Sequence, residues 1–327
     1  MSETQHYQIG NFSFQNGTTL PTVSLAYQDI NPSAEKTALV VTCFRGRLPN
    51  TCTFASGALK SYRVIVVALF GNGESSSPST TPGFPSTVDY PDCVRAQHQL
   101  LLDGLKISTL DVVVGFSMGG QATYHWTMMY PEMVKNAIII CSSARTSGHN
   151  RQFLEGPKAA LENATDYVPV ALRTSATPAC VRGIRAFGKA YSAWLTSADW
   201  FDQQLYTSLG FNSQSAWDET TTGANYNGWD ADDLLAMLGM WQRGDITALG
   251  KEPNLEASLV RINIPVLLMP CQSDQYFRWE ASEKESKMIL NATFKPIPSV
   301  WGHIGGAGAC KEDTQWMDNE ISQFLSR

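Results

Sequence analysis

One serine stands among neighbours that suit a catalytic nucleophile. Ser117 lies in the run Gly115-Phe116-Ser117-Met118-Gly119, which follows the apolar residues 112–114 and precedes a helical pattern over 119–130. A strand that turns into a helix through Gly-x-Ser-x-Gly is the context of a nucleophile elbow, and the glycines leave room for close backbone. We therefore predict that Ser117 is a nucleophile at the head of a helix. The alternative is an ordinary strand-to-helix turn.

A serine hydroxyl needs a base within hydrogen-bonding distance, and that base needs a carboxylate to orient it. When an elbow carries the serine, the acid and then the histidine follow along the chain, in loops after late strands. Asp274 comes directly after the predicted strand 264–270, and His303 follows the predicted strand 292–297. The sequence therefore predicts His303 as the base and Asp274 as the acid. A helix N-cap or loop charge is the alternative for Asp274, and a surface-loop imidazole for His303.

The other histidines fit the role of base less well. His6 lies in the N-terminal tail, and His98 and His125 fall inside predicted helices. His149 precedes a helical region, where it could contact substrate but would lie far from the base position. His303 is therefore the preferred candidate.

The tetrahedral intermediate of acyl transfer needs two N–H donors. The residue after the nucleophile, Met118, is expected to supply one of them. The loop after the predicted strand 37–42 should supply the other, with Phe44 as first choice and Cys43 as second. Arg45 in the same loop marks either an anion site or a solvent-exposed charge.

Hydrophobic patterns predict the elements that position these residues. Two alternating segments, 7–14 and 22–28, predict a hairpin around Asn16-Gly17. Apolar runs predict buried strands at 37–42, 62–69, 110–116, 137–141 and 264–270, with a last strand at 292–297. Helical patterns occur at 91–105, 119–130, 279–290 and 312–326. This order predicts an α/β fold with a mostly parallel central sheet flanked by helices.

The stretch 144–255 has a different character. It contains helical patterns without short β-branched strands, and it holds Trp194, Trp200, Trp217, Trp229 and Trp241. We predict a core domain formed by residues 1–143 and 256–327, with residues 144–255 inserted as a helical cap. Most of these tryptophans are expected to pack between cap helices, and others could line an acyl pocket.

Composition and charge exclude several classes of partner. Hydrophobic residues make up 43% of the 327-residue chain, but no apolar run approaches the ~20 residues of a membrane-spanning helix. The formal charge is −6 without a cluster of Lys or Arg, which argues against nucleic acid and anionic membranes as partners. A small-molecule acyl substrate is the expected partner, no cofactor or metal is expected, and a homodimer stays open.

The cysteines and the N-terminus bear on location. The seven cysteines are scattered and form no Cys-x-x-Cys pair, as is typical of free thiols in a reducing compartment. Residues 1–6 are polar and lack the pattern of a signal peptide. We therefore expect a cytoplasmic location.

Several further motifs carry a family resemblance. Residues 90–97 read Tyr-Pro-Asp-Cys-Val-Arg-Ala-Gln and precede Gly-Phe-Ser-Met-Gly-Gly at 115–120, Trp126 and Tyr-Pro-Glu at 130–132. Residues 43–46 look like the family's oxyanion loop, and residues 229–233 look like its cap motif. Over nearly its whole length the chain resembles the homoserine O-acetyltransferase-like branch of the α/β-hydrolases. The resemblance implies the α/β-hydrolase fold with an inserted helical cap and the same triad.

The acceptor site departs from that family's pattern. The family's homoserine enzymes hold the amino-acid carboxylate with a cap arginine, where this chain has Lys158, and lysine does not replace arginine in bidentate binding. They usually carry an aspartate directly after the catalytic histidine, where this chain has Ile304. The resemblance therefore implies a divergent member whose substrate differs from homoserine. Arg45, Lys158 and Trp301 are the candidate substrate-binding residues.

Together these observations predict a serine hydrolase that cleaves an ester or thioester through an acyl-enzyme intermediate. One alternative is an O-acyltransferase that moves an acyl group from an acetyl-CoA-type donor to an alcohol other than homoserine. Another is a hydrolase of a carbon–carbon bond beside a carbonyl. A binding protein on an inactive hydrolase scaffold is the non-enzymatic alternative, but such proteins usually lose a triad member and none is missing here.

Overall fold

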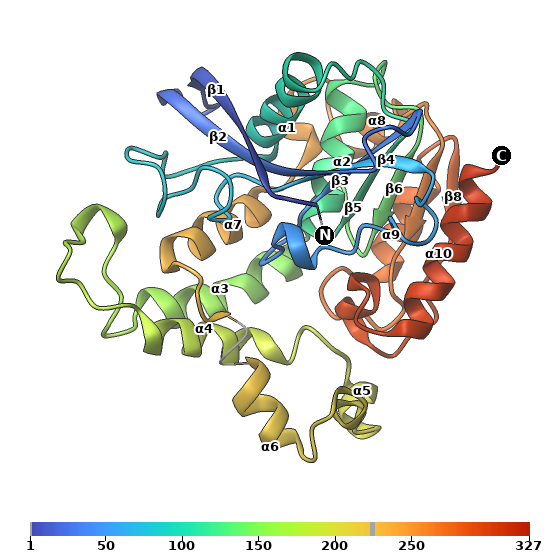
Figure 1. Ribbon diagram of the computed structural model, residues 1–327. Coiled ribbons are helices and arrows are strands. Elements are labelled where there is room, and N and C mark those ends of the chain that lie inside the picture. The colour runs from blue at the N-terminus through green and yellow to red at the C-terminus, as the bar shows by residue number, and fades with distance from the viewer. Residues whose placement is uncertain (1, 223–225) are drawn as a thin grey trace.

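The computed structural model of the chain describes residues 2–222 and 226–327, and its described strands form one eight-stranded sheet (Figure 1). The strands are β1 (Gln5–Ser13), β2 (Thr19–Ile30), β3 (Lys36–Val41), β4 (Tyr62–Val67), β5 (Val112–Phe116), β6 (Ala137–Ile140), β7 (Val266–Met269) and β8 (Ala292–Phe294). Their spatial order is β1-β2-β4-β3-β5-β6-β7-β8. β2 pairs antiparallel with β1 and β4, and all other neighbours are parallel. The predicted mostly parallel sheet is confirmed.

Helices cover the sheet and fill the segment between β6 and β7. Those outside that segment are α1 (Tyr90–Gln99), α2 (Met118–Met129), α9 (Trp279–Ser286) and α10 (Lys311–Leu325). Those within it are α3 (Gly148–Glu162), α4 (Val181–Ser192), α5 (Ala198–Asp202), α6 (Gln214–Trp217), α7 (Ala231–Arg243) and α8 (Leu255–Val260). Within the described ranges, no helix combines the length and apolarity needed to cross a membrane.

Some element ends differ from the predictions. The predicted helix 91–105 is α-helical only to Gln99 and continues as one π-helical turn, Leu100–Gly104. The predicted helix 279–290 ends at Ser286. The predicted strand 292–297 pairs with β7 only to Phe294, and one isolated bridge between Cys271 and Ile297 resumes the contact. Each difference lies at an element end, where the local pattern is least informative.

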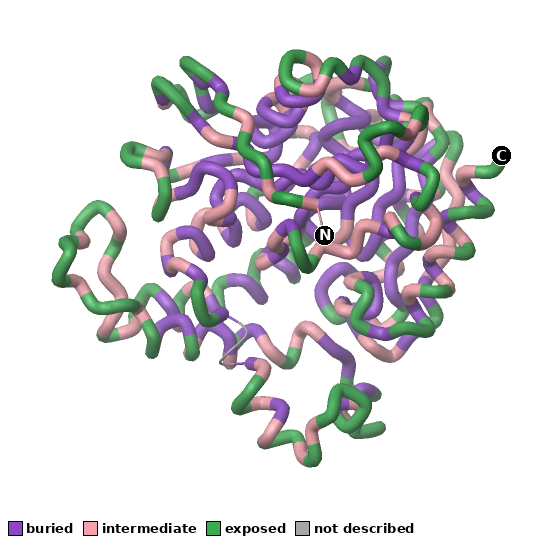
Figure 2. Tube along the Cα trace, viewed as in Figure 1, coloured by how far each residue is buried: buried purple, intermediate pink, exposed green. Residues whose placement is uncertain are grey.

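The central strands are covered on both faces. In β3, Leu39 and Val41 belong to the core cluster that includes side chains of α1 and α2, whereas Ala38 and Val40 belong to the cluster that includes α10. Successive side chains of a strand point to opposite faces, so a strand covered on both sides requires an uninterrupted apolar run. Figure 1 shows α1 and α2 in green and α10 in red beside the strands, and Figure 2 shows the central strands as buried.

The segment between β6 and β7 is helical, as predicted. Its described residues contribute helices, short turns and loops but no strand of the sheet, and α3 to α6 extend away from the strands in Figure 1. Trp200 and Trp241 are fully buried. Trp200 packs against Trp217 of the same segment with ring centroids 5.1 Å apart, whereas Trp241 stacks on Phe277, outside the segment, at 5.4 Å. The boundaries 144 and 255 of a separate cap remain a prediction.

A buried carboxyl group joins α9 to α2. Oε2 of Glu285 accepts a hydrogen bond from the Tyr124 hydroxyl (2.6 Å), and Oε1 accepts one from the Ala144 N–H (3.0 Å). Burial raises the pKa of Glu285 to about 7, although both hydrogen bonds act to lower it. The folded protein therefore binds this proton more tightly than the unfolded chain, whose glutamate has the ordinary pKa of 4.5. The resulting stabilisation is complete below about pH 4.5 and is lost as the pH rises towards 7.

Glu285→Gln should remove this pH dependence, because glutamine offers the hydrogen-bonding groups of a neutral carboxyl but does not ionise. The difference between 4.5 and about 7 corresponds to about 3 kcal/mol. We expect the free energy of unfolding of the variant, relative to the wild type, to rise by about this amount between about pH 4.5 and about pH 8. Urea unfolding at both pH values measures the change. If the difference in the free energy of unfolding between variant and wild type is the same at both pH values, Glu285 does not titrate in this range.

Candidate active site

Ser117 occupies the turn between β5 and α2. Its backbone has φ 56° and ψ −124°, a conformation that a non-glycine residue adopts only under constraint. Its N–H donates to the Ile140 carbonyl (2.9 Å), and the Ser142 hydroxyl donates to its carbonyl (2.7 Å). The neighbouring strand β6 and the loop that follows it therefore hold the turn, and the predicted strand–turn–helix context is present.

The glycines beside Ser117 allow this turn to form. A Cβ on Gly115 would lie 2.0 Å from the Gly119 carbonyl oxygen, and a Cβ on Gly119 would lie 2.4 Å from the Val41 carbonyl oxygen. Real Cβ atoms do not approach backbone so closely. The predicted need for small residues at both positions is confirmed.

Gly115→Ala should therefore destabilise the fold strongly. The new methyl group meets backbone, so the start of α2 must shift away from β5, and we expect a loss of about 3 kcal/mol or more in the free energy of unfolding. Gly148→Ala is the matched control, because a Cβ there meets nothing within 4 Å. Urea unfolding of both variants tests this, and similar losses in the two would contradict the steric argument.

The structure brings Asp274 and His303 together. Nδ1 of His303 lies 2.6 Å from Oδ2 of Asp274, and both residues are buried. Oδ1 of Asp274 accepts hydrogen bonds from the N–H groups of Tyr276 and Phe277, each at 3.0 Å. With both carboxylate oxygens engaged, Asp274 holds the proton of the imidazole on Nδ1 and leaves Nε2 as the atom that can accept one.

Aromatic rings fix the plane of this imidazole. The ring centroid of His303 lies 4.3 Å from that of Tyr276, 4.6 Å from that of Phe116 and 5.5 Å from that of Phe277. Sequence reasoning did not assign Tyr276 and Phe277 a role. Their position directly after Asp274 is the signal that could have drawn attention to them.

Ser117 and His303 line the same cavity, which has a volume of about 340 Å³. The loop after β3 contributes Cys43, Phe44 and Arg45 to its wall. Among the described residues the Ser117 hydroxyl makes no hydrogen bond, so its contact with Nε2 of His303 is not formed here. Contacts between a nucleophile and its base are often long before substrate binds, so the shared cavity is the relevant observation.

The candidate oxyanion donors lie at the carboxyl ends of adjacent strands. Met118 is the first residue of α2, where a helix N–H has no acceptor within the helix. Phe44 follows β3, which pairs with β5, in a turn closed by a hydrogen bond from the Gly46 N–H to the Cys43 carbonyl (2.9 Å). The Phe44 ring stacks on Tyr191 with centroids 5.6 Å apart. The loop is thus braced against α4, and the two donors remain a prediction.

The candidate substrate-binding residues have different positions. Arg45 lines the cavity, with its guanidinium 5.6 Å from the centre of the Tyr226 ring. Lys158 is not among the described lining residues, and its ammonium lies 4.0 Å from Glu155 on the same helix. Trp301 is not among them either, because it packs against Trp200 with centroids 6.2 Å apart. The structure thus brings only Arg45 of the three to the cavity.

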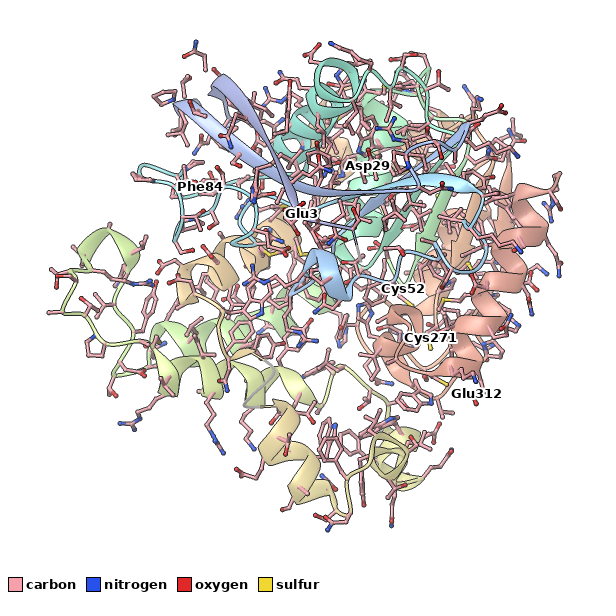
Figure 3. All side chains as sticks on the ribbon, in the orientation of Figure 1. Glu3, Asp29, Cys52, Phe84, Cys271 and Glu312 are labelled. Atoms are coloured by element: carbon pink, nitrogen blue, oxygen red, sulfur yellow. The ribbon has the colours of Figure 1, made fainter. Side chains whose placement is uncertain are left out.

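Residues between β6 and β7 form one wall of the cavity, and of the tryptophans that could line an acyl pocket Trp217 is among the described lining residues. This wall consists of residues from α4, α6 and the loops around them, namely Tyr191, Leu195, Thr196, Leu209, Trp217, Thr221 and Tyr226. Figure 3 labels Cys52, which lines another part of the cavity close to the C-terminal elements. Apart from Trp217, the sequence carries no local signal for these residues, because they become neighbours only when the loops pack.

Cys141 lies beside the Asp274–His303 pair. One possible ligand atom from each of the three residues falls within 4.8 Å of the others, so the described residues include one group that could hold a metal ion. Burial raises the pKa of the Cys141 thiol well above its ordinary value, which disfavours the thiolate that a metal needs. The Asp274 and His303 atoms are already bonded to each other. The group therefore fits an acid–base pair better than a metal site.

Comparisons with known proteins agree with this architecture. Residues 40–305 match the family described as the alpha/beta hydrolase fold. An ethyl acetate hydrolase of Pseudomonas veronii is 31% identical over 97% of this chain and 94% of its own length. The crystal structure of the acetyl esterase MekB is 30% identical, covers 99% of this chain and 97% of its own, and has a TM-score of 0.92. A homoserine O-acetyltransferase of Zymomonas mobilis is 40% identical over 29% of this chain and 27% of its own length. The chain therefore belongs to the α/β-hydrolase fold family and is an enzyme of that family.

Proposed function

We propose that this enzyme is a serine esterase that uses Ser117, His303 and Asp274. The observation that carries the proposal is the buried Asp274–His303 hydrogen bond beside a cavity that Ser117 also lines. The similarity of nearly the whole chain to an ethyl acetate hydrolase and to an acetyl esterase supports an ester with a small acyl group. Thioester cleavage uses the same acyl-enzyme and remains part of the proposal.

The proposed reaction has two halves. Oγ of Ser117 attacks the acyl carbon while Nε2 of His303 takes its proton, and the N–H groups of Met118 and Phe44 bind the oxyanion. Each such donor contributes about 3–4 kcal/mol to transition-state stabilisation. The imidazolium then protonates the leaving alcohol. Water attacks the acyl-enzyme with His303 again as base, which releases the acid and restores Ser117.

Acyl transfer to an alcohol is the second candidate. The partial similarity to a homoserine O-acetyltransferase favours it, since both activities share the first half-reaction. Against homoserine as the acceptor stand Ile304 after the base and the pairing of Lys158 with Glu155 on α3. None of the described residues that line the cavity favours carbon–carbon bond cleavage over either candidate.

Two experiments test the proposal: labelling with a fluorophosphonate probe, and ester hydrolysis in the presence of a series of alcohols that could accept the acyl group. We expect the probe to label the intact protein, and acetate to be released from ethyl acetate at a rate that added alcohols do not change. Failure of the probe to label would contradict a serine enzyme. Acyl release that depends on an added alcohol would instead support transfer, and acetyl-CoA as donor would extend that test to thioesters.

We further propose that residues 144–255 act as a cap over the cavity, since the segment supplies the wall from Tyr191 to Tyr226. The seven free thiols support a cytoplasmic location. A homodimer is compatible with this proposal, and light scattering would measure the oligomeric state directly.

A further inference from the structure

Thr196 carries a buried hydroxyl group that makes no hydrogen bond within the described residues. The residue is 1% exposed, and it lines the cavity that Ser117 and His303 also line. Buried hydroxyl groups normally have a partner, and an unsatisfied one in a native structure calls for an explanation. Leu195 and Ile304, which line the cavity with it, have apolar side chains, and no described residue supplies a partner. A molecule in the cavity can supply one.

The segment that carries Thr196 is fixed against the loop of the base. The Ile304 N–H donates to the Leu195 carbonyl (3.2 Å), and the Ser197 hydroxyl donates to the Val300 carbonyl (2.6 Å). Gly302, which precedes His303, has φ +64°, and a Cβ there would lie 2.4 Å from the carbonyl carbon of Thr196. These contacts on both sides of His303 hold Thr196 at a constant place relative to the imidazole.

We propose that the Thr196 hydroxyl holds the oxygen that exchanges at the acyl carbon: the alcohol oxygen as it leaves and the water oxygen as it enters. The inference rests on the proposed esterase reaction. It adds a group that contacts the reacting oxygen from the cap side, whereas the predicted oxyanion donors, Met118 and Phe44, come from the ends of β5 and β3.

With the Thr196 hydroxyl as an acceptor, both hydrogens of the attacking water have a partner in the second half-reaction. An attacking water donates one hydrogen to Nε2 of His303 and the other to Oγ1 of Thr196. Its oxygen forms the bond to the acyl carbon as the first proton moves to His303. The tetrahedral intermediate then breaks the bond to Oγ of Ser117, which takes the proton back from His303, and the free acid leaves. In the first half-reaction Thr196 donates to the departing alcohol oxygen while His303 protonates it.

Thr196→Val and Thr196→Ser test the role of this hydroxyl. The acetyl-enzyme formed with p-nitrophenyl acetate is followed by rapid quench and intact-protein mass spectrometry. We expect Thr196→Val to lengthen the lifetime of the acetyl-enzyme by about tenfold, which is the effect of one lost neutral hydrogen bond. Thr196→Ser keeps the hydroxyl and should have the wild-type lifetime. Valine should also lower kcat/KM for ethyl acetate, whose leaving oxygen needs a donor. It should leave kcat/KM for p-nitrophenyl acetate unchanged, because p-nitrophenolate leaves without help.

Stability separates this role from a structural one. Because the hydroxyl has no partner among the described residues, Thr196→Val should not lower the midpoint of thermal unfolding. Thr127→Val is the matched control, since the buried Thr127 hydroxyl donates to the Tyr124 carbonyl (2.8 Å) in α2. That variant should lose stability and keep the wild-type acetyl-enzyme lifetime.

Two results would overturn the inference: a wild-type acetyl-enzyme lifetime in Thr196→Val, or equally long lifetimes in the valine and serine variants. The second would assign the effect to shape instead of to the hydroxyl. Failure of the proposed esterase function looks different. In that case the wild-type protein itself would neither react with a fluorophosphonate nor form an acetyl-enzyme.

Discussion

Ser117→Ala should abolish both fluorophosphonate labelling and ester hydrolysis, with a fall in kcat/KM of at least about 10³-fold. The variant lacks the oxygen that forms the proposed acyl-enzyme. A water molecule in the space of the missing hydroxyl could attack the ester directly, but it would not be held in the right orientation and could form no covalent intermediate. The backbone bonds from the Ser117 N–H to Ile140 and from the Ser142 hydroxyl to the Ser117 carbonyl do not involve its side chain. The fold should therefore survive, which thermal unfolding can verify.

Ser143→Ala is a suitable control for that experiment. Its hydroxyl is also largely buried, but it donates to the Arg145 carbonyl (2.8 Å), and Ser143 is not among the described residues that line the cavity. We expect this variant to be labelled and to hydrolyse esters as the wild type does. Hydrolysis that survives in Ser117→Ala, or labelling at another serine, would refute the assignment of the nucleophile.

Asp274→Asn should lower kcat by about 10⁴-fold, as expected for a triad whose base is held in the wrong tautomer. The N–H groups of Tyr276 and Phe277 both donate to Oδ1, so the asparagine carbonyl must face them. Its NH₂ group then points at Nδ1 of His303, in place of the carboxylate oxygen that now lies 2.6 Å away. Two donors cannot share that contact, so Nδ1 becomes an acceptor and the proton moves to Nε2. The imidazole can then no longer accept the proton of Ser117.

Asp111→Asn provides the comparison for this substitution. The Asp111 carboxylate also accepts a backbone hydrogen bond, from the Thr37 N–H (2.8 Å), but it precedes β5 at the opposite end of the strands. Its replacement should leave kcat unchanged. Steady-state kinetics of both variants, with circular dichroism to confirm folding, measures the difference. Near-wild-type activity in Asp274→Asn would mean that another group orients His303.

The elements of the sheet and the identity of the Asp274–His303 pair were accessible from sequence because their causes are local or topological. Apolar runs such as 37–42 correspond to strands buried on both faces, as β3 is. Gly115 and Gly119 signal the elbow because backbone fills the space beside them. Asp274 and His303 follow successive parallel strands, β7 and β8, whose carboxyl ends meet at one edge of the sheet. The sequence order alone therefore predicted their contact.

Most of the cavity wall was not accessible in this way, and of the three candidate substrate-binding residues only Arg45 lines it among the described residues. Motif position pointed to Lys158, but in α3 this lysine pairs with Glu155. Proximity to His303 in the sequence pointed to Trp301, but this tryptophan packs on Trp200. Thr196 lies in no motif, and the role proposed for its hydroxyl rests on the absence of a partner among the described residues beside the His303 loop.

The sequence by itself determined the sheet, the elbow and the placement of Ser117, Asp274 and His303 after successive strands, because strand periodicity and parallel connections leave little freedom in where strand ends meet. Only the tertiary structure decided which side chains between β6 and β7 face the cavity. Those side chains lie on short helices and loops, and their directions depend on packing against distant residues such as Gly302. No pattern within a few residues encodes contacts of that kind.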